Sequence, residues 1–485
     1  MAVAIYMVGA LLITIYTLGE FHLLYILFKR KGDPKFEPET QVWDWDTLPK
    51  VTVQLPMYNE QYVAKDVISA CAQLDYPKDK LEIQVVDDSN DETKAIVDEQ
   101  VAFWSSKGIN IKVFRRDHRA GYKAGALRDA TPYAEGDFIA IFDADFKPEP
   151  DFLQKSIPYF KHENVGVVQG KWGHINRDYS VLTKAQSAFL DMFFLIEQKA
   201  RSLGGYFLRF NGSAGVWRKV CIEDAGGWSA DTLSEDLDLC FRAQLKGWKV
   251  LYDEKIVAPA EVPVTILDFK TQQYRWTKGK AQVIRKLGPK LWKANIPLLS
   301  KVHAFFDLYN IFVLPGFFSL AISSVFISYL ITQIPKYNSI LALSTVGLIN
   351  IVLVPIFLWI VIGDYKKGIV PKAIEFVKTL PPFIGTLLGI TFFQLLSFLD
   401  GIRGGDAVFH RTAKYNISTK GDSWHNKLYS PREIPIVTYA EGSLVVLFLF
   451  ALWVDFSFKS YGFVPSHIVF TAGFGFVFLN SIVRS

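Results

Sequence analysis

The chain has 485 residues, of which 50% are hydrophobic and 15% aromatic, and its mean hydropathy is +0.18. Such a composition indicates a chain that lies partly in lipid. The net charge is +5, but Lys and Arg residues flank apolar segments, as in "LFKRKGD" and "GDYKKG", and form no single basic block. This pattern favours a membrane surface and argues against nucleic acid as a partner.

The three cysteines of the chain, Cys71, Cys221 and Cys240, are odd in number, and no Cys-x-x-Cys pair occurs. A disulfide framework is therefore not expected. The simplest interpretation is a reduced, cytosolic environment in which the cysteines are packed in the interior or chemically inert.

Residues 3–27 form the first long apolar segment, and Lys29, Arg30 and Lys31 follow it directly. No basic stretch precedes the segment and no small-residue cleavage pattern follows it, so we expect an uncleaved membrane anchor in residues 1–34. The positive charge behind it predicts that the chain continues on the cytosolic side. Residues 35–300 are expected to form a cytosolic domain, with interfacial helices near its end.

Beyond residue 301 apolar segments return, and we expect an α-helical, multi-pass membrane region in residues 301–485. A stretch at 383–399 has basic residues on both sides, so the positive-inside rule predicts that a segment of about 371–402 lies in the membrane interface or re-enters on the cytosolic side. With residues 3–27, the prediction is an integral membrane protein with five crossings. The later crossings, each approaching the roughly 20 apolar residues that span a bilayer, are residues 311–331, 340–362, 436–454 and 467–482.

Between the first and second crossings, four apolar strand-like runs end in, or lead into, polar and charged residues: "KVTVQLPMYNE", "LEIQVVDDSNDET", "INIKVFRRD" before "HRAGYKAGAL", and "FIAIFDADF". Helical stretches alternate with these runs, which predicts a mainly parallel α/β sheet. In such sheets, ligands bind beyond the carboxyl ends of the strands. The residues at these ends are Tyr58, Glu60, Asp87, Asp88, Lys123, Asp143 and Asp145.

Asp143 and Asp145 repel each other unless a positive group lies between them. Mg²⁺ and Mn²⁺ take oxygen ligands, often one or two carboxylates together with phosphate oxygens. Lys123, at a helix start, adds positive charge for a diphosphate, together with the backbone amides there. The residues therefore favour a nucleotide sugar bound with Mg²⁺ or Mn²⁺. The alternative is an ordinary turn, because a lone Asp-x-Asp or Asp-Asp-Ser is also typical of turns.

Seven motifs in this order resemble those of family 2 glycosyltransferases with a GT-A fold: "PMYNE", "VVDDSNDET", "HRAGYKAGAL", "FDADF", "FNGSAGVWR", "TLSEDLDL" and "QQYRW". The last is similar to the pattern of the membrane-embedded, processive cellulose, chitin and hyaluronan synthases. "FNGSAGVWR" is similar to the cellulose-synthase-like A proteins, which make β-mannan and glucomannan, and to their bacterial relatives. The resemblance covers about residues 51–276 and implies a GT-A domain inserted between transmembrane helices.

The resemblance also implies a role for each matching residue. Asp236 of "SEDLD" stands where the family has its general base, beside Glu235, with Ser234 in place of the family's Thr. Such a base takes the proton of an acceptor hydroxyl during direct attack, which inverts the anomeric centre. The implied donor-binding residues are Tyr58, Glu60, Asp87, Asp88, Lys123, Asp143, Gln272, Arg275 and Lys414. The implied acceptor-binding residues are Trp172, Asn211, Gly212 and Trp276, and the implied metal ligands are Asp143 and Asp145.

Gln272, Arg275 and Trp276 stand just before the membrane region. An arginine can fork onto two pyrophosphate oxygens, whereas a tryptophan offers a flat face to a sugar ring. The alternative for Trp276 is an aromatic anchor at the membrane interface, and the alternative for Trp172 is a place in the domain core.

One loop matches a mechanistic feature of the family. In "AVFHRTAKYN", Phe409, Thr412 and Lys414 have the spacing of the gating loop of cellulose synthases, Phe-x-Val-Thr-x-Lys, with Arg411 in place of the Val. We expect residues of about 406–418 to cover the bound donor, to bring Lys414 to its phosphates and to exclude water. The alternative is a basic loop that contacts anionic lipid.

The sequence thus predicts an inverting, metal-dependent hexosyltransferase that extends a β-linked polysaccharide from GDP-mannose or UDP-glucose, with membrane lipids around it, and the resemblance implies translocation of the product. The alternative is a glycolipid synthase of the ceramide glucosyltransferase type, which makes a single transfer to a lipid. A non-catalytic sensor or scaffold is a third possibility, but Asp236 and the Asp-x-Asp, whose loss would mark it, are both present. No motif encodes the choice of sugar.

Overall fold

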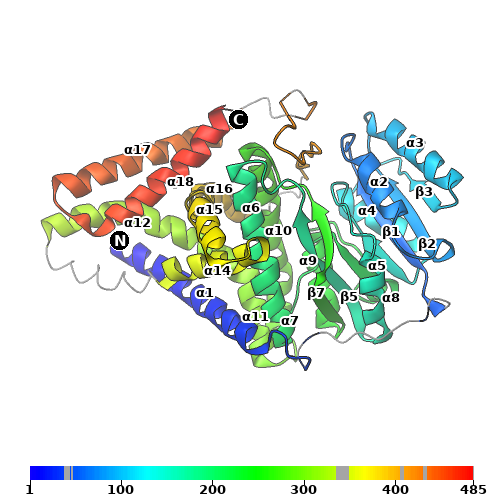
Figure 1. Cartoon of the computed structure of the whole chain (residues 1–485). Coiled ribbons are helices and arrows are strands. Elements are labelled where there is room, and N and C mark those ends of the chain that lie inside the picture. The colour runs from blue at the N-terminus through cyan, green and yellow to red at the C-terminus, as the bar shows by residue number, and fades with distance from the viewer. Residues whose placement is uncertain are drawn as a thin grey trace.

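The computed structural model describes residues 1–35, 37, 44, 47–334, 349–404, 409–425, 427–429 and 434–483. A domain built on a β-sheet and a bundle of helices lie side by side (Figure 1). The first helix, α1 (Ala2–Arg30), belongs to the bundle, although the sheet domain follows it in the chain. The chain therefore starts in the bundle, passes through the sheet domain and returns, as predicted.

The sheet has seven strands in the order β3-β2-β1-β4-β6-β5-β7. β1, β2, β3 and β4 run parallel to one another, and β5 runs parallel to β7. β6 is antiparallel to both of its neighbours, β4 and β5, so the prediction of a mainly parallel sheet is confirmed. The strands are β1 (Val51–Met57), β2 (Leu81–Asp87), β3 (Asn110–Phe114), β4 (Phe138–Ile141), β5 (Val165–His174), β6 (Gly215–Arg218) and β7 (Lys249–Ala260).

Helices cover both faces of this sheet, which explains why its central strands are apolar without alternation. Phe138 and Ala140 of β4 pack into one core with α2, α3 and α5, while Ile139 and Ile141 pack into the other with α8 and α9. The cysteines are buried in these two cores and unpaired, as expected. The helices of the domain are α2 (Ala64–Ala72), α3 (Thr93–Ser106), α4 (Tyr122–Ala130), α5 (Phe152–Ser156), α6 (Val181–Met192), α7 (Lys199–Gly204), α8 (Lys219–Asp224) and α9 (Glu235–Leu245).

The helical bundle joins the two ends of the chain. α1 packs along α12, the hairpin of α17 and α18 packs against α15, and α10 packs against α16. α10 runs along the boundary between the bundle and the sheet domain (Figure 1). The helices after the sheet are α10 (Ile266–Lys293), α11 (Leu298–Tyr309), α12 (Val313–Gln333), α14 (Ile349–Tyr365), α15 (Ile369–Gly389), α16 (Thr391–Arg403), α17 (Ile436–Ser457) and α18 (Val464–Val483).

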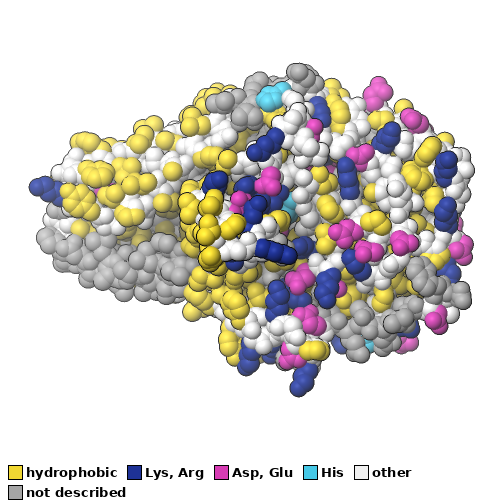
Figure 2. Space-filling model, in the orientation of Figure 1, with side chains coloured by type: hydrophobic (Ala, Val, Ile, Leu, Met, Phe, Trp, Pro, Cys, Tyr) yellow, Lys and Arg dark blue, Asp and Glu magenta, His cyan; other side chains and the backbone are white. Residues whose placement is uncertain are grey.

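Five helical segments of the described chain are long and apolar enough to cross a membrane, judged by length and composition: Ala2–Arg30, Leu298–Ile331, Ile369–Arg403, Ile436–Ser457 and Tyr461–Ile482. On the face drawn in Figure 2, hydrophobic side chains predominate over the bundle, and charged side chains are spread over the sheet domain. This division matches the expected membrane region and soluble domain.

The number of apolar spans equals our expected five, but the set differs by one. Of the expected crossing 340–362, the residues before 349 lie outside the described chain, and the apolar part that is described, Leu353–Gly363, is short. The segment that we expected in the interface, 371–402, consists of α15 and α16 and satisfies the length and composition of a span. Its interfacial position remains a prediction.

Candidate active site

A cavity opens at the carboxyl end of the parallel strands, where the prediction placed the ligand. Its lining comes from the strand ends, the first turns of α4 and α9, the helix α10 and the loop that follows α16. It brings together nearly all of the residues that the sequence singled out. These are Tyr58, Glu60, Asp88, Lys123, Asp143, Asp145, Trp172, Asn211, Gly212, Glu235, Asp236, Gln272, Arg275, Trp276 and Lys414.

Asp87 is the expected residue that the cavity lining does not include. It ends β2 with a fully buried side chain, accepts from Nε of Arg115 at 2.9 Å and accepts from the backbone N–H of Ser89 at 2.9 Å. Asp88 points to the cavity instead, and Nε of Arg116 donates to it at 3.0 Å. Successive residues of an extended chain face opposite ways, which separates the two aspartates.

Each carboxylate of the Asp-x-Asp pair has a lysine partner. Nζ of Lys123 lies 2.5 Å from Oδ1 of Asp143 and donates to the backbone carbonyl of Gly212 at 2.9 Å. Nζ of Lys414 lies 2.6 Å from Oδ2 of Asp145, and that oxygen also accepts from the backbone N–H of Glu261 at 3.2 Å. The positive charge that two neighbouring carboxylates require is thus supplied by one lysine of the domain and one of the distant loop.

The same two carboxylates fit a divalent cation that a diphosphate accompanies. Among the described residues, no group of three or more His, Cys, Asp or Glu side chains forms a complete metal site. A hard cation held here would therefore need phosphate oxygens as further ligands, as Mg²⁺ commonly does. The carboxylate of Asp143 is 37% exposed toward the cavity and open to such a complex.

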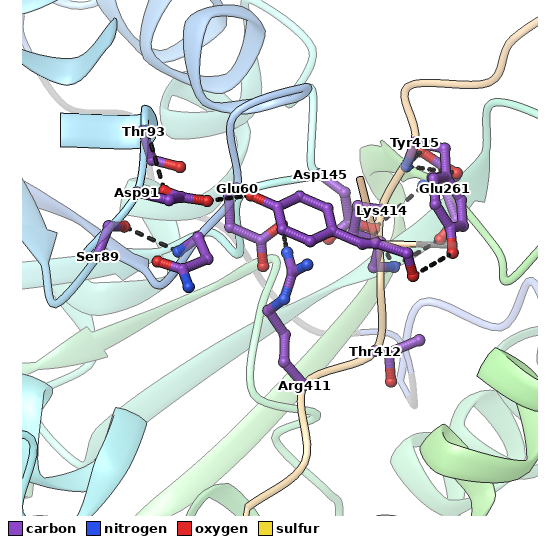
Figure 3. Close-up of polar contacts among 12 residues, drawn as sticks. Glu60, Ser89, Asp91, Thr93, Asp145, Glu261, Arg411, Thr412, Lys414 and Tyr415 are labelled. Atoms are coloured by element: carbon purple, nitrogen blue, oxygen red, sulfur yellow. Dashed lines mark hydrogen bonds and ion pairs between the residues drawn. The ribbon is translucent and has the colours of Figure 1, made fainter. Parts of the chain in front are cut away.

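The loop after α16 contributes Phe409, Arg411, Thr412 and Lys414 to the lining of this cavity, and Figure 3 shows the last three of these beside Glu60, Asp145 and Glu261 of the domain. Arg411 forms an ion pair with Glu60, with Nη1 at 2.8 Å from Oε2, and Arg275 donates to the hydroxyl of Thr412 at 2.9 Å. The backbone N–H of Tyr415 contacts both carboxylate oxygens of Glu261, at 3.1 and 3.2 Å. The described part of the expected loop, residues 409–418, therefore folds into the domain in this structure.

The side chain of Phe409 adds aromatic contacts between the loop and the domain. The ring of Phe409 lies 5.8 Å from the ring of Tyr122 and 4.5 Å from the guanidinium of Arg275. Further along the chain, the hydroxyl of Tyr429 donates to Asp91 of the domain. Burial under the loop raises the pKa of Glu60 to about 8, although Arg411 opposes the shift.

Asp236 and Glu235 form the first turn of α9, where the helix dipole favours negative charge. Burial raises the pKa of Asp236 to about 7, and the neighbouring charge of Glu235 contributes. Burial alone would lower the pKa of Lys123, but Asp143 and Glu235 raise it above its ordinary value. The cavity therefore holds a carboxylate that can gain or lose a proton near neutral pH, close to a charged lysine.

Gly212 lets the backbone approach this carboxylate. Its φ is +80°, and a Cβ on it would lie 2.8 Å from Oδ2 of Asp236 and 3.4 Å from Nζ of Lys123. Only glycine adopts such a conformation without strain and leaves this space. The neighbouring Asn211 has an amide oxygen that is buried and has no hydrogen-bond partner among the described residues, so it is available to a ligand in the cavity.

Two tryptophans occupy the end of the cavity nearest the bundle. The ring centroids of Trp172 and Trp276 are 6.3 Å apart, and Nε1 of Trp172 donates to the backbone carbonyl of Ser213 at 3.3 Å. Trp172 also packs on Phe146 at 5.2 Å and against both sheet cores. Trp172 thus lines the cavity and also packs against the domain core, and its role toward an acceptor stays a prediction.

Several lining residues were absent from the sequence-based site. Glu261 follows β7, a strand we did not predict, and its signal was the one used elsewhere, an acid just beyond a strand end. Arg119 lies over the ring of Tyr58, with its guanidinium carbon 3.2 Å from the centroid. Arg411 replaces the hydrophobic residue of the family's loop and pairs with Glu60.

The comparisons with known proteins agree with this geometry. Residues 52–224 match the family described as Glycosyl transferase family 2. The chain carries a glycosyl transferase family 2 domain. That domain spans β1 to α8 and so holds Asp143 and Asp145, whereas Asp236 and the loop follow it.

Relatives extend the similarity beyond the family 2 domain. Glucomannan 4-beta-mannosyltransferase 9 of Arabidopsis thaliana is 38% identical over 347 residues, which cover 68% of this chain and 64% of the relative. Glucomannan 4-beta-mannosyltransferase 2 of the same plant is 43% identical over 279 residues, covering 56% and 52%. The chain thus spans between about half and two thirds of the length of these relatives.

Among solved structures, a mannosyltransferase from Pyrobaculum calidifontis in complex with GDP-Man and Mn²⁺ is similar, with a TM-score of 0.57 and 19% sequence identity. The match covers 83% of this chain and 99% of that chain. Together with the family 2 match, this similarity confirms the expected GT-A fold of the domain, followed by apolar helices.

Proposed function

We propose that the protein is an inverting, metal-dependent β-mannosyltransferase that extends a β-linked glycan at a membrane. The observation that carries the proposal is one cavity in which the lysine-paired carboxylates Asp143 and Asp145 face the carboxylate of Asp236. GDP-mannose is favoured over UDP-glucose because the relatives are named glucomannan 4-beta-mannosyltransferases and the solved neighbour holds GDP-Man.

Donor binding would use the charges at the strand ends. Mg²⁺ or Mn²⁺ held by Asp145 and Asp143 would neutralise the diphosphate and assist its departure. Lys123 and Lys414, which pair with these carboxylates in the structure, are positioned to turn their ammonium groups to the phosphates. Arg275 and Gln272, one helical turn apart on α10, line the cavity beside them, and the nucleoside would lie toward Tyr58 and Asp88.

Asp236 would act as the general base. An acceptor hydroxyl is a weak nucleophile until a carboxylate takes its proton during attack, and a pKa of about 7 suits that transfer at neutral pH. Attack on the side opposite the leaving diphosphate converts an α-linked donor into a β-glycoside. The loop from Phe409 to Tyr415 would exclude water from this step, since its contacts already cover the cavity.

The acceptor would enter from the end of the cavity that Trp172 and Trp276 line. A separate small pocket lies between α6, α10, α15 and α16 and is lined by aromatic residues and amides. Polar side-chain atoms of this pocket are buried without a partner among the described residues, on Gln186, Gln273, Thr386 and Gln394. Groups of this kind suit a hydroxyl-rich chain and support product translocation through the bundle.

The orientation follows from charge. Lys29 and Arg30 stand in the last turn of α1 and Lys31 follows it, at the end that leads to the sheet domain, and the positive-inside rule places such residues in the cytosol. We infer that the protein is an integral membrane protein whose catalytic domain faces the cytosol, where nucleotide sugars are made.

The test is synthesis in vitro. The full chain in lipid nanodiscs, with Mn²⁺ or Mg²⁺, is incubated separately with radiolabelled GDP-mannose, UDP-glucose and UDP-N-acetylglucosamine, and the products are sized and digested with linkage-specific glycosidases. We expect polymer from GDP-mannose that β-mannanase degrades, and none from Asp236→Asn or after chelation of the metal. Label that remains in organic-extractable lipid would instead support a glycolipid synthase.

A further inference from the structure

His174, the last residue of β5, belongs to a relay that none of the roles above uses. It lines the cavity two residues after Trp172, on the same face of the strand. Its Nε2 lies 3.0 Å from Oδ1 of Asp191 in α6, and the hydroxyl of Tyr365, at the end of α14, donates to Oδ2 of Asp191 at 2.8 Å. The relay runs from the cavity wall to the first described helix beyond α12.

Burial of His174 and Asp191 determines which ring nitrogen of His174 carries the proton. The side chains of His174 and Asp191 are 2% and 1% exposed, so Asp191 has no water in place of its two protein donors. A carboxylate is an acceptor only, so the bond to Asp191 places a proton on Nε2 of His174. In that tautomer, Nδ1 keeps a lone pair. In the described part of the chain no hydrogen bond uses that atom, and the residue borders the cavity.

Tyr365, at the far end of the relay, is also held in place by a neighbouring side chain. The guanidinium of Arg177 lies 4.2 Å from the ring centroid of Tyr365 and forms an ion pair with Glu375 of α15 at 3.1 Å. Lys184 contacts the same Glu375 at 3.0 Å. Tyr365 is thus fixed between the domain and the bundle, and through Asp191 it fixes the imidazole.

The position of His174 favours the acceptor over the donor. The groups suited to phosphate are the lysines and Arg275 around Asp143 and Asp145, and among the described residues His174 forms no hydrogen bond or ion pair with any of them. Its neighbour on the strand is Trp172, whose ring faces Trp276 at 6.3 Å. A pyranose that lies on an aromatic face directs its hydroxyls sideways, where an imidazole nitrogen can accept one.

We infer that Nδ1 of His174 accepts a hydrogen bond from a hydroxyl of the glycan acceptor, with Asp191 and Tyr365 as positioning residues. The inference rests on the proposed function, because it takes that glycan as the ligand. It makes His174 a specificity residue for the sugar beside Trp172, distinct from the base Asp236.

The experiment measures acceptor binding apart from catalysis. A β-1,4-linked mannopentaose is titrated into the full chain in nanodiscs by calorimetry without donor, and its KM is measured with GDP-mannose and Mn²⁺. His174→Ala should weaken mannopentaose binding about five- to tenfold, the loss of one hydrogen bond with its partner left unpaired. Donor KM and donor hydrolysis should stay within about twofold of the parent.

Two further variants separate a ligand contact from a structural role. His174→Asn keeps a polar atom near the position of Nδ1 and should recover most of the affinity for mannopentaose. Asp191→Asn should raise the acceptor KM and leave kcat within about twofold, because it disturbs only the ring's orientation and tautomer. His162→Ala, a histidine outside the cavity lining, is the control and should match the parent.

The outcomes distinguish failure of the inference from failure of the proposed function. Parent-like mannopentaose affinity in His174→Ala overturns the inference while the proposed function stands. Loss of donor hydrolysis in His174→Ala, with an unchanged melting temperature, also overturns it and assigns the residue to catalysis. A parent protein that neither binds mannopentaose nor transfers from GDP-mannose overturns the proposed function, and the inference with it.

Discussion

Lys414 and Asp145 are 269 residues apart in the chain, yet Nζ of the lysine lies 2.6 Å from Oδ2 of the aspartate. Both side chains are largely buried, at 13% and 6% exposure. The ammonium therefore occupies an oxygen that a divalent cation would need, and burial strengthens the competition between the two positive charges. Lys414 and a bound metal ion would therefore compete for Oδ2 of Asp145.

Removal of the lysine should consequently favour the metal. In Lys414→Met we expect Mn²⁺ to bind severalfold more tightly in the absence of donor, and transfer to fall at least tenfold because the phosphates lose a charge partner. Electron paramagnetic resonance of free Mn²⁺ measures the affinity. Lys147→Met is the matched control, since Lys147 pairs with Asp66 at 2.7 Å. Equal Mn²⁺ affinity in parent and Lys414→Met would contradict the competition.

The pKa of Asp236 predicts the acid side of the activity profile. A general base works only when ionised, so with a pKa of about 7 the rate at subsaturating acceptor should fall about tenfold for each pH unit below that value. Asp236→Asn should lower kcat by at least a thousandfold and change the affinity for GDP-mannose less than threefold. Initial rates between pH 5 and 9 and donor titrations measure both. A rate that is flat down to pH 5 would assign the base role elsewhere.

The same raised pKa carries a stability cost. The folded state binds this proton more tightly than the unfolded chain, whose aspartate has a pKa of 3.8, so the stability associated with the proton is lost as pH rises from about 4 through 7. Replacing the carboxyl by an amide removes the cost, on the order of 1.4 kcal/mol for each pKa unit. Asp236→Asn should melt at a higher temperature than the parent at pH 8, and the gain should be smaller at pH 5.

A substitution at Gly212 tests whether catalysis depends on the close approach of the backbone to Asp236. In Gly212→Ala the new Cβ would meet Oδ2 of Asp236 at 2.8 Å, so the carboxylate must move and kcat should fall at least a hundredfold. Gly205→Ala is the control, because Gly205 also has a positive φ, +68°, but its Cβ would meet nothing within 4 Å. Both variants pay a backbone strain of about 1–2 kcal/mol, so a difference in kcat isolates the contact.

A buried ion pair ties α10 to the last two helices. Nζ of Lys270 lies 2.6 Å from Oε2 of Glu441 and donates to the hydroxyl of Ser481 at 2.9 Å. Glu441→Ala leaves the lysine buried without its partner and should lower the free energy of unfolding by about 3–5 kcal/mol, whereas Lys270→Met with Glu441→Met should recover most of it. Denaturation in mixed detergent micelles measures this. A double variant as unstable as Glu441→Ala would exclude the explanation by an unpaired charge.

Much of the first half of the sheet could be predicted because each of its strands is marked by a pattern in its own short sequence. β1, β2 and β4 are apolar runs that end in acids, and buried parallel strands have this pattern. β5, β6 and β7 were not recognised as strands. β6 has only four residues, and β7 pairs with β5 across the intervening residues 175–248. Such pairing depends on contacts that no local pattern records.

Prediction of the site from the sequence was limited in the same way, because local patterns do not record long-range contacts. Asp143, Asp145 and Asp236 stand in motifs with a chemical meaning, so the sequence identified them. The choice of Asp88 over Asp87 depended on which of the two points to Arg115, the residue that follows the neighbouring strand β3. The contact between Arg411 and Glu60, 351 residues apart, could not be inferred from either neighbourhood. The relay from His174 to Tyr365 joins three elements whose sequences share no motif.

The distance between Glu60 and Arg411 along the chain also has a consequence for biosynthesis. At about 5–20 residues per second, a ribosome that has finished Glu60 adds Arg411 roughly 20–70 s later, after the segments from α10 to α16 have been made. The other cavity residues are complete only once Trp276 of α10 has been made, so from that point until Arg411 is added the nascent chain has the donor pocket without its cover. Translation itself thus delays the closed site until the helices that precede the loop are available to the membrane.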